Sequence, residues 1–183
     1  FDEAIAEVLE AQTLDPLSPV VSPNVGWTLH LAGRYERARE VLERVVRRYP
    51  SGLISHFYLG FVLAALGRLD DAIRSFRVAA ESAGGMPFAA EALGWALALD
   101  GQTEAARRLL LAARARAATT YVPTSAFAMI HLGLGEDEAM FACLDRCVEE
   151  RDALLPWIKV MPEFQRVRPD PRFQAVLGRI GLT

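Results

Sequence analysis

The sequence predicts an all-α protein: a right-handed α-solenoid of antiparallel helical hairpins that ends in a C-terminal capping helical segment. Residue types recur every 34 positions, nearly uncharged stretches alternate with charged amphipathic ones, and a glycine separates the two at regular intervals. A hairpin of this kind cannot bury its apolar faces alone. A repeated hairpin therefore implies stacked neighbours that share one continuous core.

The 34-residue period is visible in four columns of the sequence. Two columns hold mostly small residues, one holds the glycines of the predicted turns, and one holds large apolar residues. The columns are Ala4, Ala38, Ala72, Ala106 and Met140; Gly26, Gly60, Gly94 and Ala128; Gly33, Gly67, Gly101 and Gly135; and Val8, Leu42, Phe76, Leu110 and Leu144.

The segment 53–80 shows one hairpin most clearly. Its first half, 54–66, has no acidic residue, no Lys and no Arg, and is predicted to be a helix that is apolar on all sides. Gly67 opens the predicted turn. In the second half, Ala72, Phe76 and Ala79 share one face of an amphipathic helix. The same alternation predicts further helices at 1–13, 24–32, 36–49, 88–99, 103–117, 124–132 and 136–149.

These helices form four predicted repeats within a single domain, 1–183. The first helix of a partial repeat is absent, since Phe1 falls in the column of Tyr35 and Leu69, where second helices begin. We therefore expect the sequence to be part of a longer array or a longer protein. The predicted boundaries are 1–18 for the partial repeat, 19–52, 53–86, 87–120 and 121–154 for the repeats, and 155–183 for the cap.

The period stops after Arg151, and an atypical end is expected there because an array must cover its last apolar face. We expect a short helix at 153–160, which Pro162 breaks. Asp170 is a good N-cap, and Pro171 suits the first position of a last helix that reaches about residue 180.

The repeats resemble the tetratricopeptide repeat, whose period is also 34 residues. The resemblance lies in a small residue early in the first helix, a Gly-x-Tyr/Leu-x-x-Ala opening of the second helix, and a proline near the end of the unit, at Pro16 and Pro50. It implies a non-enzymatic module for protein–protein interaction. It also implies that the first helices line a concave groove and the second helices form a convex outer layer.

The C-terminal segment is similar to the tail of bacterial tetratricopeptide regulators that carry an N-terminal output domain. That resemblance implies that the chain is the regulatory or scaffold part of a larger bacterial protein in signalling or transcription. It is carried by residues 149–152, 157–160, 162–164, 170–173 and 179–182.

Composition argues against several other classes of function. The net charge of −3 and the pI of about 5.7 give no bulk attraction to nucleic acid, so no direct nucleic-acid contact is expected. The uncharged stretches contain internal Gly or Pro and keep the repeat register, so we interpret them as buried helices and expect no membrane insertion. With no export signal and two cysteines, a cytoplasmic location with reduced thiols is expected.

The sequence shows no set of residues typical of catalysis. It contains no nucleophile elbow, phosphate-binding loop or paired-carboxylate pattern, so we predict no enzymatic activity and no catalytic residue. His56 and His131 are interpreted as packing residues, and Cys147 as a small buried residue. Because no ligands converge at short spacing, neither a metal site nor a cofactor is expected.

Large side chains on the first helices predict a partner-binding groove. Trp27, Phe61, Trp95 and Met129 occupy one repeat position, on the side of each first helix that helical spacing turns inward. Packing between repeats is the alternative, but a helix that is apolar all round implies burial all round, which an empty groove would not give. We therefore expect an apolar or amphipathic peptide or helix to cover the groove. The predicted partner-binding residues are Asn24, Trp27, His30, Phe57, Tyr58, Phe61, Phe88, Glu91, Trp95 and Met129.

A second hypothesis is self-association. In this case the groove, or the N-terminal edge around Ile5, Val8 and Leu9, would join copies of the chain in a homo-oligomer. The carboxylate clamp that some tetratricopeptide domains use for acidic chaperone tails is not expected. Its basic residues are missing from the inward positions, and only Asn24 is of a suitable type.

Overall fold

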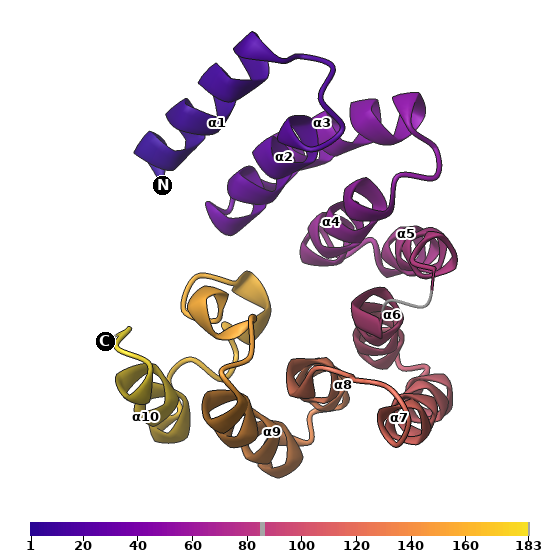
Figure 1. Ribbon diagram of the computed structural model, residues 1–183, viewed down its shortest axis with the longest axis vertical. Coiled ribbons are helices and arrows are strands. Elements are labelled where there is room, and N and C mark those ends of the chain that lie inside the picture. Colours follow the sequence, from indigo (N-terminus) through magenta and orange to yellow (C-terminus); the bar gives the residue numbers. More distant parts are fainter. Residues whose placement is uncertain (85–86, 183) are drawn as a thin grey trace. The chain divides into compact units, whose positions relative to one another are not determined.

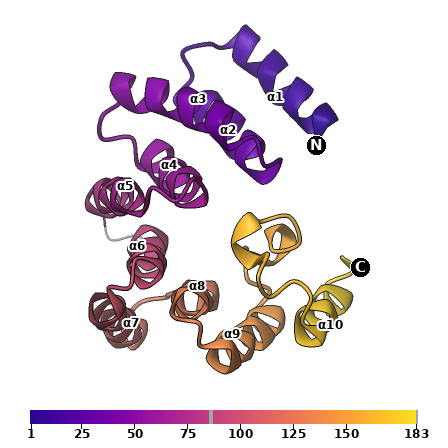
Figure 2. The same ribbon diagram turned by 180° about the vertical axis from the view of Figure 1, so that it is seen from behind.

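The computed structural model describes residues 1–84 and 87–182, and over these residues the predicted all-α fold is confirmed. Within residues 1–82, and again within residues 87–179, helices that follow each other in the chain pack against each other, as in a helical solenoid (Figures 1 and 2). The chain divides into two compact units, Phe1–Gly85 and Met86–Thr183. No helix in the described ranges is long and apolar enough to cross a membrane.

Unit 1 contains five helices. The pairs α2/α3 and α4/α5 each form a hairpin, and α1 packs against α2. Gly33 and Gly67, at the turns of the two hairpins, have φ values of 71° and 73°, in the left-handed region that residues with a Cβ disfavour. The helices are α1 (Asp2–Leu14), α2 (Val21–Leu31), α3 (Tyr35–Arg48), α4 (Leu53–Ala65) and α5 (Leu69–Ser82).

The second column of small residues is explained by close packing within these hairpins. A Cβ added to Gly26 would lie 2.7 Å from Cδ2 of Leu42, and one added to Gly60 would lie 2.6 Å from Cε1 of Phe76. Leu42 and Phe76 are completely buried. In both hairpins of unit 1, the small and the large residue of the 34-residue period are therefore the two sides of one contact between the helices.

Helix α2 begins at Val21, three residues before the predicted start. Pro23 had suggested a later start, but it lies in the first turn of the observed helix. A proline is tolerated in that turn because its missing N–H has no partner there in any case.

Unit 2 contains two more hairpins and the C-terminal cap. The pairs α6/α7 and α8/α9 are antiparallel, α6 also packs on α8, and α10 packs on α9. The elements are α6 (Pro87–Leu99), α7 (Thr103–Ala117), α8 (Thr124–Leu134), α9 (Asp137–Glu150), the 3-10 turns η1 (Leu155–Trp157) and η2 (Pro162–Phe164), and α10 (Pro171–Arg179).

The short helix expected at 153–160 is present only as the three-residue 3-10 helix η1. Pro156 lies inside the segment and has no N–H to donate, so the chain forms the tighter 3-10 turn η1 there instead. The prediction for the last helix is confirmed, because the side chain of Asp170 accepts a hydrogen bond from the N–H of Arg172 at 2.8 Å.

Asp152 and Arg166 attach the segment after α9 to the two ends of the last hairpin. Asp152, which is buried, accepts a hydrogen bond from the N–H of Ser125 in the first turn of α8 at 3.0 Å. Arg166 donates two hydrogen bonds to Asp137 in the first turn of α9, at 2.9 and 2.6 Å. Because α8 and α9 are antiparallel, these two turns lie at opposite ends of the hairpin. The segment 152–166 therefore runs along the hairpin.

The predicted repeat boundaries and the single domain stay predictions. Positions 85 and 86, at the end of the predicted repeat 53–86, and position 183, at the end of the predicted cap, lie outside the described residues.

Candidate functional site

One face of unit 1 combines aromatic rings with exposed apolar side chains. On α2 and the residue before it, and again on α4, side chains at the spacing i, i+4, i+7 share a face. The two helices pack against each other, so the two rows lie side by side. We call this surface the α2–α4 face; it consists of Val20, Asn24, Trp27, Ile54, Tyr58 and Phe61.

Trp27 is the centre of the α2–α4 face. Its ring stacks on Tyr58, with centroids 4.7 Å apart and planes 15° apart, and on His30, at 5.0 Å and 19°. Trp27 and Tyr58 are both partly exposed, whereas His30 is completely buried. Burial of the hydroxyl raises the pKa of Tyr58, so the phenol is neutral at physiological pH. The stack holds two large rings in place with part of their surface accessible.

Further rings hold the stack in position from behind. Phe61 lies 5.8 Å from Trp27 and meets Phe57 and Phe76 edge to face, at 5.1 and 5.0 Å. Such edge-to-face pairs are favourable because the positive edge of one ring meets the negative face of the other. Phe61 is only 3% exposed, so its contribution to this face is to support Trp27.

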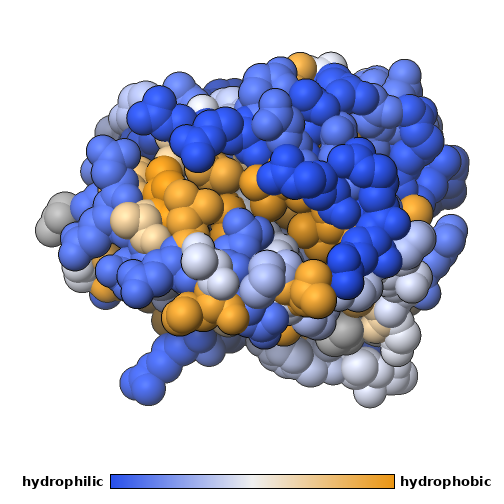
Figure 3. Space-filling model, turned by 90° about the horizontal axis from the view of Figure 1, so that it is seen from above, coloured by the Kyte–Doolittle hydropathy of each residue, from blue (hydrophilic) through white to orange (hydrophobic). Residues whose placement is uncertain are grey.

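The rim of the α2–α4 face is apolar. Val20 is 65% exposed and Ile54 is 41% exposed, while the side chain of Asn24 is held by its own helix, donating to the carbonyl of Val20 at 3.0 Å. Seen from above, the surface of the molecule shows a group of hydrophobic residues with hydrophilic residues around it (Figure 3). Exposed apolar side chains that gather on one face, as Val20 and Ile54 do beside Trp27, are typical of a surface that contacts another protein.

In unit 2 the corresponding residues are mostly buried. Trp95 is 5% exposed and Met129 is 7% exposed, and Phe88 is partly exposed. Trp95 packs against α8, where its Cδ1 would lie 3.1 Å from a Cβ on Gly133. The predicted binding residues of unit 2 thus offer much less accessible surface than Trp27 and Tyr58.

Glu91 is buried in an ion pair with Arg116, which joins α6 to the end of α7. Only one carboxylate oxygen is engaged, since Oε2 has no hydrogen-bond partner among the described residues. Burial raises the pKa of Glu91 to about 7, against the opposing effect of Arg116. Within unit 2 this residue holds two helices together, although the sequence suggested a place in the groove.

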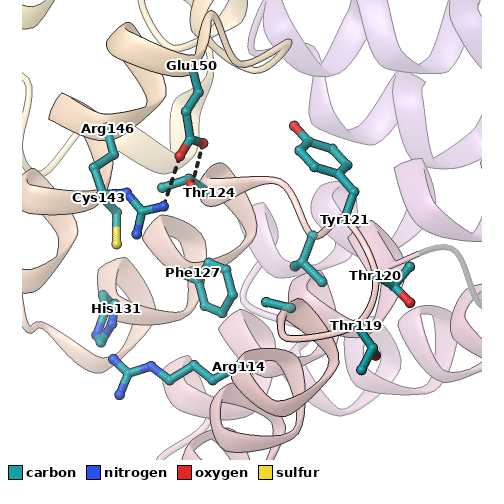
Figure 4. A pocket seen from close by; sticks show the side chains of 12 residues that line it. Arg114, Thr119, Thr120, Tyr121, Thr124, Phe127, His131, Cys143, Arg146 and Glu150 are labelled. Carbon is teal, nitrogen blue, oxygen red and sulfur yellow. Dashed lines mark hydrogen bonds and ion pairs between the residues drawn. The ribbon is translucent and has the colours of Figure 1, made fainter.

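A pocket of about 620 Å³ lies between α7, α8 and α9 in unit 2 (Figure 4). Sequence reasoning did not find it. Its basic residues, Arg114 and Arg146, belonged to no site that the sequence predicted. The signal in the sequence that could have indicated the pocket is Ala118, which occupies the repeat position of Pro16 and Pro50. Because the preceding residue, Ala117, is also small, little side-chain volume fills the end of α7.

Residues 32–87 match the family model of the tetratricopeptide repeat. The matched segment includes α3, α4 and α5, and therefore the part of the α2–α4 face that consists of Ile54, Tyr58 and Phe61. A search of curated proteins found no match to this chain. Tetratricopeptide repeats belong to a non-catalytic family of modules and generally mediate protein–protein interactions.

His56 and His131 have structural partners. A ring nitrogen of His56 lies 2.9 Å from the carbonyl oxygen of Pro50, and Nδ1 of the buried His131 lies 2.6 Å from Glu136. Helical spacing could not predict the pair of His131 and Glu136, because the two residues are five apart and meet across the C-terminal end of α8. Burial acts to raise the pKa of Glu136, but hydrogen bonds from His131 and Arg107 lower it below its usual value.

The two cysteines are unreactive in this environment. Cys143 is partly exposed, and Cys147 is completely buried, as expected from the sequence. Burial raises the pKa of both thiols, so both stay protonated at neutral pH. The search for clusters of three or more His, Cys, Asp or Glu suited to a metal ion found none over the described ranges.

Proposed function

We propose that the α2–α4 face binds an apolar or amphipathic segment of another protein, and that the chain is the non-enzymatic regulatory or scaffold part of a larger bacterial cytoplasmic protein. The observation that carries the proposal is the stack of Trp27 on Tyr58. Two large rings are fixed by packing while part of each remains accessible.

Ring fixation favours binding for two reasons. Trp and Tyr are the residues that most often dominate protein–protein interfaces, because they bury much area and lose few rotamers. A ring that is already held by its neighbours loses little further freedom when a partner covers it. The exposed side chains of Val20 and Ile54 would extend this contact on both sides of the rings.

The spacing of the face suggests the form of the partner. The two rows run along adjacent helices, and an amphipathic helix lying across them would present apolar residues at i, i+4 and i+7. Because no carboxylate or basic side chain belongs to the α2–α4 face, recognition of such a helix would depend on apolar contact rather than on charge.

The test is a selection of helical peptides from a display library, followed by fluorescence anisotropy on the selected sequences. We expect peptides with apolar residues at helical spacing, and a loss of affinity of about 30-fold or more in Trp27→Ala, since truncating a central aromatic residue costs about 2 kcal/mol or more. Tyr58→Ala should weaken the same peptides.

The matched control is Trp157→Ala, because Trp157 is 47% exposed but lies in η1 of unit 2. This variant should bind as the wild type does. Circular dichroism on all variants checks that the helices are retained. If the selected peptides bind Trp27→Ala and Tyr58→Ala as tightly as the wild type, the α2–α4 face is not the binding surface.

A second candidate function is self-association through the N-terminal side of unit 1. The observation in favour is that α1 contains no buried residue, while Leu14 is 81% exposed and Leu17 after it is 55% exposed. Light scattering over a dilution series should then show a mass that rises with concentration, and Leu14→Glu should abolish the rise. A constant monomer mass at all concentrations would exclude this function.

A further inference from the structure

The pocket of unit 2 has a basic side that the proposed peptide-binding function does not use. Arg114 enters it from α7 and Arg146 from α9, on either side of Cys143 and His131 (Figure 4). Both guanidinium groups lie near the Cys143 thiol. The positive charge of each lowers the pKa of that thiol, although the larger effect of burial raises it. Two cations therefore approach one end of the pocket.

Glu150 neutralises only one of the two cations. Its carboxylate accepts a hydrogen bond from Nη2 of Arg146 at 2.9 Å and one from the hydroxyl of Thr124 at 2.6 Å. These bonds fix Arg146 in place and lower the pKa of Glu150, which stays ionised at neutral pH. For Arg114, no hydrogen bond or ion pair is found over the ranges that the structure describes.

The rest of the pocket is suited to the body of a small organic molecule. Phe127 contributes an aromatic ring, and Thr119, Thr120 and Tyr121 line the pocket from the loop between α7 and α8. A volume of about 620 Å³ lies within the range in which proteins hold small ligands. The protonated Cys143 adds no nucleophile, so the pocket is equipped to bind rather than to react.

We propose that this pocket binds a small organic anion, with a carboxylate or phosphate group between Arg114 and Arg146 and an apolar body against Phe127. An anion there would pair with Arg114, whose charge Glu150 does not neutralise. Guanidinium groups suit this role because their N–H donors match the oxygens of carboxylate and phosphate. The site is separate from the α2–α4 face and does not depend on the function proposed for it.

The test uses phenyl phosphate and benzoate as probes and benzyl alcohol as the neutral probe, with binding followed by two-dimensional ¹H–¹⁵N NMR. We expect saturable shifts at Thr119, Thr120 and Phe127 with the two anions, and dissociation constants on the order of millimolar, given the affinity that ligands of this size reach. Benzyl alcohol should bind at least tenfold more weakly. Raising the salt concentration should weaken the binding of the anions.

Three variants make the test specific. Arg114→Gln should weaken both anions about fivefold or more, because it removes the unpaired cation. Arg108→Gln on the same helix changes the net charge equally outside the pocket, and should leave affinity within about twofold of the wild type. Glu150→Gln removes the competing carboxylate and should strengthen binding by about two- to fivefold.

The proposal is overturned if phenyl phosphate gives no saturable shift, if benzyl alcohol binds equally well, or if Arg114→Gln binds like the wild type. A further arm distinguishes the source of the anion. If a pentapeptide with a central phosphotyrosine and four uncharged residues binds at least as tightly as phenyl phosphate, the anion belongs to a protein segment. If the peptide is excluded while phenyl phosphate binds, the ligand is a free small molecule.

Discussion

Glu91 keeps its proton in the folded protein at pH values where an unfolded chain has lost it. Burial raises its pKa to about 7, whereas a Glu in an unfolded chain titrates near about 4.3. Between these two pH values the folded state binds more protons than the unfolded state. The contribution of Glu91 to stability is therefore full below about pH 4.3 and is lost as the pH rises through about 7.

Replacing Glu91 by Gln should remove this pH dependence. From pH 5 to pH 8, the free energy of unfolding of the wild type should fall relative to that of Glu91→Gln by about 1–3 kcal/mol, measured by urea denaturation. Glu104→Gln is the control, since Glu104 is exposed on α7 and should keep the wild-type pH dependence. Equal slopes for wild type and Glu91→Gln would show that the carboxyl is ionised throughout.

Helical spacing was sufficient to place Trp27 on one helix face with Asn24, and Tyr58 on one face with Ile54, because side chains at i, i+4 and i+7 share a face whatever surrounds the helix. It could not show that Phe61, at the same spacing, is covered by other rings. That Trp27 and Tyr58 bind a partner stays a prediction. The exposure of a side chain depends on the residues that pack on it from elsewhere in the chain. The partners of Glu91 and His131 were missed for the same reason, since Arg116 lies on the next helix and Glu136 lies beyond the helix end.

The hairpins depend on close contact between their two helices, and Gly26 is a direct test. Gly26→Ala should lower the free energy of unfolding by about 1–3 kcal/mol, because the new Cβ would lie 2.7 Å from the buried Leu42. Gly67→Ala is the comparison, with no atom within 4 Å of its Cβ but a left-handed backbone that costs about 1 kcal/mol. Chemical denaturation followed by circular dichroism measures both. A neutral Gly26→Ala would mean that Leu42 moves aside freely.

The first turn of α8 depends on the carboxylate of Asp152. Asp152→Ala should cost about 1–3 kcal/mol of unfolding free energy, since the N–H groups of Ser125 and Leu154 lose their acceptor. Asp145→Ala is the matched control, because Asp145 is exposed and its ion pair with Arg179 is worth under about 1 kcal/mol. Equal effects of the two substitutions would contradict the role assigned to Asp152.

At the level of elements, the repeat period predicted the type and order of the helices, because each 34-residue unit restates the same apolar pattern. The cap was predicted less well, since it has no second copy against which to compare it. Asp170 and Pro171 still marked the start of α10, as these residue types act locally at a helix start. Asp152 and Arg166, by contrast, act on turns that lie far away in the sequence.

The two compact units predict additive behaviour in the whole molecule. Gly26→Ala disturbs Leu42 inside unit 1, and Asp152→Ala disturbs Ser125 and Leu154 inside unit 2. The double variant should therefore lose the sum of the two single effects to within about 0.5 kcal/mol, measured by urea denaturation. A coupling energy above about 1 kcal/mol would show that the two sites share a cooperative element.

The cap also limits how this chain can be lengthened. In a stacked array, each added hairpin packs on the outer side of the last one. Here α10 and the segment 152–166 already occupy the last hairpin, fastened at both of its ends by Asp152 and Arg166. A designer who wants a longer scaffold should therefore insert an extra 34-residue unit before α8 rather than append one after α10.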